Sequence, residues 1–254
     1  MKLNHSHVKK IFSFLIFAGS FLLIISCTKE KESYQSSSNN LTSDSTINSN
    51  ALDTSIKSYL ALGDSYTVAQ SVQKDGSFPA QLVQMLRDKN INVTDPEIIA
   101  ATGWTTQNLL SSLAANPPKQ TYSFVTLLIG VNNQYQGGSL EDYKTQFTQL
   151  LNMAISYAGN KKNHVFALSI PDYSVTPFAN GSDTQKIAMQ IDEFNEANKI
   201  ISSNAGVHYL DITSISRNAK NDPLLIAGDG LHPSAKQYSQ WDELLAPLIE
   251  NEIH

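Results

Sequence analysis

Ser65 is the residue of this sequence whose type and position first suggest chemistry. It follows the apolar run Tyr59–Leu62 and the pair Gly63-Asp64, so it stands just past the carboxyl end of a short predicted strand. Open α/β sheets place their ligands at that edge, where a hydroxyl can be exposed yet rigidly held, as a nucleophile must be. Gly-Asp-Ser is also common turn chemistry, so the tripeptide alone leaves an ordinary turn as the alternative.

Three further stretches carry residues that could act with this hydroxyl. Gly103 follows the second predicted strand, Asn132 follows the third, and Asp229 precedes His232 by three residues just before the last predicted helix. Because the carboxyl ends of parallel strands share one edge of a sheet, we expect these loops to converge on Ser65. Taken singly, each has a simpler explanation as a turn residue or, for His232, as the entry to a helix.

Together, these stretches resemble the four sequence blocks of the SGNH hydrolases, the GDSL esterase/lipase family. The blocks occur in order across residues 57–254, as Gly63-Asp64-Ser65, Gly103, Gly130-Val131-Asn132 and Asp229-x-x-His232-Pro233. One such block is a weak signal, but four in order are a strong one. The chain departs from the pattern at Tyr66, where many members have Leu, and at Asn133, where many have Asp. Neither position has a chemical role in the family.

The resemblance implies a serine esterase, and the residue types suit that chemistry. Ser65 is the expected nucleophile, and His232 is the general acid/base that takes its proton, since imidazole titrates near neutral pH. Asp229 would accept the other imidazole N–H and fix the orientation of the ring. The backbone N–H groups of Ser65 and Gly103 and the side-chain amide of Asn132 would form the oxyanion hole. The missing Cβ of Gly103 suits close approach to a substrate.

The elements that must position these residues follow from the alternation of apolar runs with helical periodicity. This alternation predicts a parallel sheet with helices on both faces, and the near-continuous apolar run at 122–129 predicts a central strand. The resemblance adds a three-layer α/β/α fold with a five-stranded parallel sheet in flavodoxin-like order. The predicted strands are 59–62, 97–101, 122–129, 164–170 and 207–210, and the predicted helices are 78–90, 105–113, 139–157, 183–203 and 233–249.

Charge and composition exclude several classes of function. The chain has 254 residues and a net charge of −5, and because residues 1–26 contribute three positive charges, the remainder carries −8. An acidic body without a Lys/Arg cluster argues against a nucleic-acid partner and against attraction to anionic lipid. Asp229-x-x-His232 offers too few ligands for a metal, and no nucleotide loop or zinc motif is present. We therefore expect no cofactor and no metal. The protein is also expected to be a monomer.

The first 55 residues are predicted to lie outside the globular domain. Residues 1–26 have three lysines followed by a 15-residue apolar run, which is typical of a signal peptide and short for a membrane span. Leu23-Ile24-Ile25-Ser26-Cys27 resembles a bacterial lipobox, which implies cleavage before Cys27 and lipidation of it. A plain signal peptide or an uncleaved anchor is the alternative. Residues 27–55 are rich in Ser, Asn and Thr and are predicted to be a flexible tether to a hydrolase domain at 56–254.

The predicted location and substrates follow from these assignments. A lipid-anchored protein of the bacterial cell envelope is expected, at the outer membrane, and the charged run 28–32 resembles the surface-export signals of Bacteroidetes lipoproteins or is simply the start of a solvated tether. The substrate is a small ester or an acylated lipid or glycan, and lysophospholipid, short-chain acyl and acetyl esters all stay open. The alternative function is an inactive, surface-tethered module on the same fold that binds glycan or lipid. Tyr66, Trp104, Tyr135, Tyr173 and Phe178 are predicted to lie in loops near the site, either as a binding surface or as wall packing.

Overall fold

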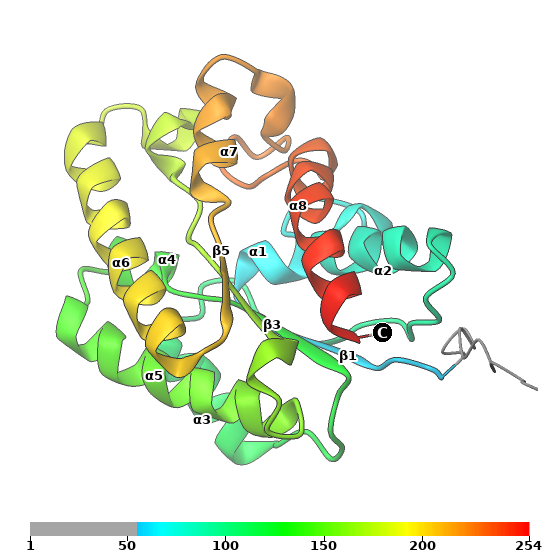
Figure 1. The fold of residues 1–254 in the computed structure, drawn as a ribbon. Coiled ribbons are helices and arrows are strands. Elements are labelled where there is room, and N and C mark those ends of the chain that lie inside the picture. Colours follow the sequence, from blue (N-terminus) through cyan, green and yellow to red (C-terminus); the bar gives the residue numbers. More distant parts are fainter. Residues whose placement is uncertain (1–54, 254) are drawn as a thin grey trace, which may run out of the picture. The chain divides into compact units, whose positions relative to one another are not determined.

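A five-stranded parallel sheet forms the centre of the domain in the computed structural model, which describes residues 55–253 (Figure 1). The strand order is β2-β1-β3-β4-β5, and every neighbouring pair is parallel. This is the flavodoxin-like order that was expected, so the fold prediction is confirmed. The strands are β1 (Tyr59–Gly63), β2 (Glu97–Ala100), β3 (Phe124–Leu128), β4 (Val165–Leu168) and β5 (His208–Leu210).

Helices cover both faces of the sheet (Figure 1). On one face α2 and α8 pack against each other, and on the other α5 packs against both α3 and α6. The residues of β1, β3 and β4 are all buried, whereas those of β2 and β5, at the edges, are partly exposed. This explains why the central strands are continuous apolar runs, since both of their faces lie under helices. The helices are α1 (Ser65–Val68), α2 (Phe78–Asp88), α3 (Thr106–Ala115), α4 (Val131–Tyr135), α5 (Leu140–Tyr157), α6 (Thr184–Ala205), α7 (Thr213–Arg217) and α8 (Ala235–Ile253).

Local chemistry sets where the long helices begin. Thr105 caps α3 in a capping box, in which its hydroxyl accepts the backbone N–H of Asn108 and the Asn108 side chain accepts the N–H of Thr105. Ser139 and Asp183 cap α5 and α6 in the simpler way, each accepting a backbone N–H in the first turn. The cap at Thr105 fixes the loop before α3, which carries Thr102 and Gly103.

The signal peptide predicted at 1–26, the lipidation predicted at Cys27 and all but the last residue of the tether predicted at 27–55 lie outside the described residues. Within residues 55–253, none of the helices is both long and apolar enough to span a membrane.

Candidate active site

Ser65 is the first residue of α1, and only Asp64 separates it from the end of β1. Asp64 caps this helix by accepting the backbone N–H of Tyr66 at 3.0 Å. Gly63 is required because a Cβ there would lie 2.1 Å from the Thr67 hydroxyl and 2.5 Å from the Leu128 carbonyl oxygen. The turn from strand to helix is therefore tightly packed, and only 5% of Ser65 is exposed. Its hydroxyl is held on a rigid support at the predicted edge of the sheet.

Asp64 lies behind the serine as a fully buried carboxyl group. Burial raises its pKa from 3.8 to about 7, although hydrogen bonds from the backbone of Tyr66 and Gly130 partly oppose the rise. Its Oδ2 atom has no hydrogen-bond partner among the described residues. Asp64 therefore holds its proton at mildly acidic pH, and its contribution to stability depends on pH.

Asp229 and His232 lie on one tight turn before α8. Asp229 Oδ1 accepts the backbone N–H groups of Leu231 and His232 at 2.9 and 3.0 Å, and its Oδ2 lies 2.6 Å from His232 Nδ1. Burial raises the pKa of Asp229, but hydrogen bonds from Ser71, from the His232 ring and from these two N–H groups outweigh it and hold the pKa below its ordinary value. Because Asp229 is ionised, His232 Nδ1 must be the donor. The free ring nitrogen, Nε2, is thereby left for other chemistry.

Ser71 is a member of this cluster that the sequence did not reveal. Its hydroxyl donates to Asp229 Oδ2 at 2.7 Å, the same oxygen that accepts from His232. Ser71 has φ of 66°, a left-handed conformation that residues other than glycine rarely adopt. The strained turn after α1 thus links the serine-bearing segment to the turn that carries the acid. No local sequence signal marks a contact between residues so far apart.

Asn132 lies in the first turn of α4, and hydrogen bonds tie this helix to the loop that carries Gly103. Asn132 Nδ2 donates to the Trp104 carbonyl at 3.0 Å, and its second N–H remains available. Asn133 accepts from the Thr106 backbone N–H at 2.9 Å and donates to the Thr106 hydroxyl at 2.7 Å. The residue that departs from the family pattern therefore has a structural role, which is to lock α4 against the start of α3.

Gly103 needs to be glycine for a reason other than crowding. Its φ is 83°, which strains any other residue, while no atom lies within 4 Å of the position of a Cβ. The missing Cβ was expected to let the backbone approach a substrate closely, and this can apply only on the side of Gly103 that faces open space, where a ligand would lie. Gly103 is exposed at the rim of the cavity that Ser65, Asn132 and His232 also line.

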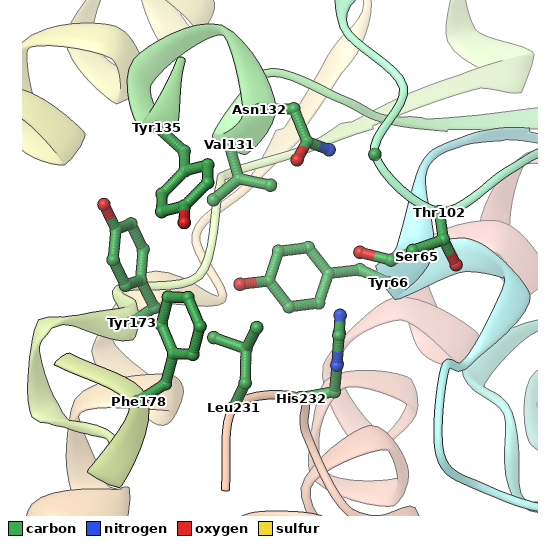
Figure 2. Close-up of a pocket in the computed structure, with 11 residues that line it drawn as sticks. Ser65, Tyr66, Thr102, Val131, Asn132, Tyr135, Tyr173, Phe178, Leu231 and His232 are labelled. Atoms are coloured by element: carbon green, nitrogen blue, oxygen red, sulfur yellow. The ribbon is translucent and has the colours of Figure 1, made fainter. Parts of the chain in front are cut away.

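A cavity of about 130 Å³ brings the predicted residues together. Figure 2 shows Ser65, Asn132 and His232 around one end and aromatic side chains around the other. Tyr135, Tyr173 and Phe178 form a cluster with ring centroids 5.9 to 6.3 Å apart. The lining residues are Ser65, Tyr66, Thr102, Gly103, Val131, Asn132, Tyr135, Tyr173, Phe178, Leu231 and His232.

Trp104 follows the wall-packing alternative, since it does not line the cavity but packs, partly buried, against the hydrophobic core. The prediction that Tyr66 and Tyr135 lie in loops is wrong, because they lie on the short helices α1 and α4. Asp229 also stands behind His232 and does not line the cavity. Within residues 55–253, no group of three or more His, Cys, Asp or Glu side chains is placed to hold a metal ion.

The fold and this cavity define an α/β domain with a serine, an imidazole and an amide at the carboxyl edge of its sheet. The sequence pattern of the GDSL-like lipase/acylhydrolase family matches residues 61–240. The chain belongs to this family of hydrolases.

Solved structures with the same fold are similar to this chain at low sequence identity. TesA is 17% identical with a TM-score of 0.61, covering 77% of this chain and 99% of its own. The lipase Lip_vut3 from a goat rumen metagenome is 20% identical with a TM-score of 0.61, covering 76% and 97%. Axe2, an acetylxylan esterase from Geobacillus stearothermophilus, is 18% identical with a TM-score of 0.56, covering 78% and 94%. No curated protein matches the chain significantly.

Proposed function

We propose that this protein is a GDSL-type esterase that hydrolyses carboxylic esters through Ser65, His232 and Asp229. The observation that carries the proposal is the hydrogen-bonded pair of Asp229 and His232 facing the cavity that Ser65 also lines. Family membership supports ester hydrolysis, and the geometry supports these three residues as its catalytic machinery.

The reaction follows from the donors and acceptors around the cavity. His232 Nε2 takes the Ser65 hydroxyl proton as the serine oxygen attacks the ester carbonyl, and Asp229 stabilises the imidazolium that forms. The proton then passes to the leaving alcohol, which departs and leaves an acyl-serine. A water molecule, deprotonated by the same imidazole, attacks the acyl-serine, and the imidazolium returns the proton to the Ser65 oxygen as the acid is released. In the described structure Ser65 and His232 have no direct hydrogen bond, and such bonds often form only when substrate is bound.

The oxyanion of each tetrahedral intermediate needs donors that are already in place. The free N–H of Asn132 and the backbone N–H groups of Ser65 and Gly103 are the proposed donors. The loop that carries Gly103 and the helix α4 that carries Asn132 are fixed to each other through Trp104 and Thr106. These donors therefore need little reorganisation during the reaction, which is the condition for strong electrostatic stabilisation.

A direct test is the turnover of p-nitrophenyl acetate by the purified protein. Wild type is expected to release p-nitrophenol steadily, and Ser65→Ala to fall to the uncatalysed rate. Equal rates for the two proteins, whether high or zero, would refute the assignment. Retention of ester or glycan ligands without any turnover would instead support the inactive binding module.

The cavity supports an ester with small substituents, because it holds only about 130 Å³, is mostly apolar and is bounded by the aromatic cluster of Tyr135, Tyr173 and Phe178. Among the structures of the same fold are an acetylxylan esterase and a lipase. We favour acetyl and other short-chain esters over long-chain lipids. A panel of acetyl, butyryl and long-chain p-nitrophenyl esters with acetylated xylan tests this, and fastest turnover of the long chains would contradict it.

We also propose that the protein is anchored to the membrane of the bacterial cell envelope by lipid at Cys27. The lipobox-like Leu23-Ile24-Ile25-Ser26-Cys27 and the tether that follows support this. Metabolic labelling with an alkyne fatty acid tests the proposal in cells. The label should be incorporated by wild type and absent from Cys27→Ala, and equal labelling would contradict it.

A further inference from the structure

The phenol of Tyr66 occupies an unusual place in the wall of the cavity. The residue is only 3% exposed, and its ring packs edge-on to His232 and Trp241 with centroids 5.8 and 6.5 Å away. Figure 2 shows the hydroxyl aimed across the cavity, away from Ser65 and toward the aromatic cluster. Within residues 55–253, the structure gives this hydroxyl no hydrogen-bond partner.

Other buried phenols show how this one differs. Tyr59 lies in the core and its hydroxyl pairs with the Thr126 hydroxyl at 2.8 Å. Among the described residues, the buried hydroxyls of Tyr143 and Tyr238 have no hydrogen-bond partner, but neither residue lines the cavity. Only the Tyr66 hydroxyl, of these four, opens on the space where a ligand would lie. An unpaired donor that faces a binding space gains a hydrogen bond only when a ligand or a water molecule supplies an acceptor.

The surroundings select the kind of acceptor. Burial, followed by the nearby Asp64, Tyr173, Asp172 and Asp229, raises the pKa of the Tyr66 phenol well above 10. The phenol is therefore protonated at neutral pH and acts as a donor. None of the described residues that line the cavity is a Lys or an Arg, and the acidic groups around it disfavour an anionic ligand. An uncharged oxygen is the acceptor that fits.

We infer that the Tyr66 hydroxyl is a specificity-determining donor that selects esters carrying an uncharged oxygen, as a hydroxyl, ether or carbonyl, in the part that fills the cavity. The inference rests on the proposed esterase function and deepens it by naming the substrate class. Because Tyr66 directly follows Ser65 and its side chain extends away from it, the recognised oxygen lies several bonds from the scissile carbonyl. A plain alkyl group of the same size would leave the donor unpaired, which is how a polar pocket rejects an isostere.

The test compares matched pairs of esters in wild type and Tyr66→Phe, which keeps the ring and removes the hydroxyl. The acyl-side pair is p-nitrophenyl 3-methoxypropionate and p-nitrophenyl pentanoate, and the alcohol-side pair is 2-methoxyethyl acetate and butyl acetate. For each pair we compare kcat/KM of the oxygen-bearing ester with kcat/KM of the alkyl ester. In one of the two pairs Tyr66→Phe should lower this ratio by roughly tenfold, because one neutral hydrogen bond is lost. The pair that responds identifies the side of the ester that fills the cavity.

Tyr238→Phe is the matched control, since Tyr238 also packs on Trp241 and has an unpaired hydroxyl but does not line the cavity. It should leave both ratios as they are in wild type. Ratios that are unchanged in Tyr66→Phe, or that fall equally in Tyr238→Phe, would overturn the inference.

A separate arm keeps this inference distinct from the proposed function. If wild type hydrolyses none of the four esters, the esterase proposal fails, and binding of 2-methoxyethyl acetate and butyl acetate to Ser65→Ala is measured by calorimetry. If Ser65→Ala binds the methoxy compound more tightly than butyl acetate, and adding Tyr66→Phe to it abolishes that preference, recognition by the phenol would still be supported. No preference in binding, together with no response in turnover, would overturn it.

Discussion

Ser71 offers the sharpest prediction, because its backbone and its hydroxyl should affect stability and activity differently. The residue has φ of 66°, and its hydroxyl donates to Asp229 Oδ2, the oxygen that also orients His232. Ser71→Ala removes the hydroxyl and keeps the strain. Ser71→Gly removes both. We expect both variants to lose activity alike but to differ in stability.

The magnitudes follow from the two interactions. A hydrogen bond to a charged group contributes about 1.5 kcal/mol at the lower end, which suits an exposed serine and corresponds to roughly a tenfold fall in kcat if it is lost in the transition state. A left-handed conformation at a residue other than glycine costs about 1 kcal/mol. The free energy of unfolding of Ser71→Gly should therefore be about 1 kcal/mol higher than that of Ser71→Ala, which corresponds to a Tm roughly 2–4 °C higher for a domain of this size.

The assay is kcat on a short-chain p-nitrophenyl ester together with urea unfolding of the same preparations. Asn160→Gly is the control, since Asn160 is exposed, has φ of 63° and lies outside the residues that line the cavity. It should not lower kcat. If activity followed stability, so that Ser71→Gly kept wild-type kcat while Ser71→Ala lost it, the hydroxyl would have no role in positioning Asp229.

Three further predictions concern residues around the serine. Asn132→Ala should lower kcat roughly 10²- to 10³-fold with a smaller change in KM, because it removes a donor to the oxyanion, and an effect mainly on KM would contradict this role. Asp229→Asn should lower kcat roughly 10³- to 10⁴-fold, since an amide no longer holds the imidazole as a carboxylate does, and a loss below tenfold in steady-state assays would remove Asp229 from the mechanism. The pKa of Asp64 is raised to about 7 in the folded protein, whereas the carboxyl group of the unfolded chain loses its proton near pH 3.8. The stability of the protein therefore falls as the pH rises from about 3.8 to about 7. Asp64→Asn should remove that fall, so that at pH 8 its free energy of unfolding exceeds that of wild type by up to about 4 kcal/mol, while near pH 4 the two proteins are equally stable. Urea unfolding across this pH range measures the difference, and equal pH slopes for the two proteins would contradict the raised pKa.

Much of the fold could be predicted because its signals are local. The three central strands β1, β3 and β4 are apolar runs, and the caps Thr105, Ser139 and Asp183 stand immediately before the helices they begin. The ends of the strands were less certain. The run 122–129 predicts a longer strand than Phe124–Leu128, because Tyr122 and Ile129 are buried outside the strand itself.

The site was predictable only in part, for a similar reason. Ser65, Gly103, Asn132, Asp229 and His232 lie in motifs that a single sequence displays, and all but Asp229 line one cavity. The short helices α1 and α4 contain four and five residues, too few to show helical periodicity.

Contacts between distant segments leave no pattern in the sequence. The hydrogen bond from Ser71 to Asp229 joins residues 158 positions apart, and the pairing of Asn133 with Thr106 joins residues 27 apart. The direction of the Tyr66 hydroxyl likewise depends on how α1 packs against His232 and Trp241. These three features needed the structure.

Covalent trapping of the serine tests the central claim most directly. A fluorophosphonate probe should attach to one peptide, with the added mass on Ser65, and the labelling should vanish in Ser65→Ala and become far slower in His232→Ala. Attachment at another residue, or labelling of Ser65 at the same rate without the imidazole of His232, would contradict the account.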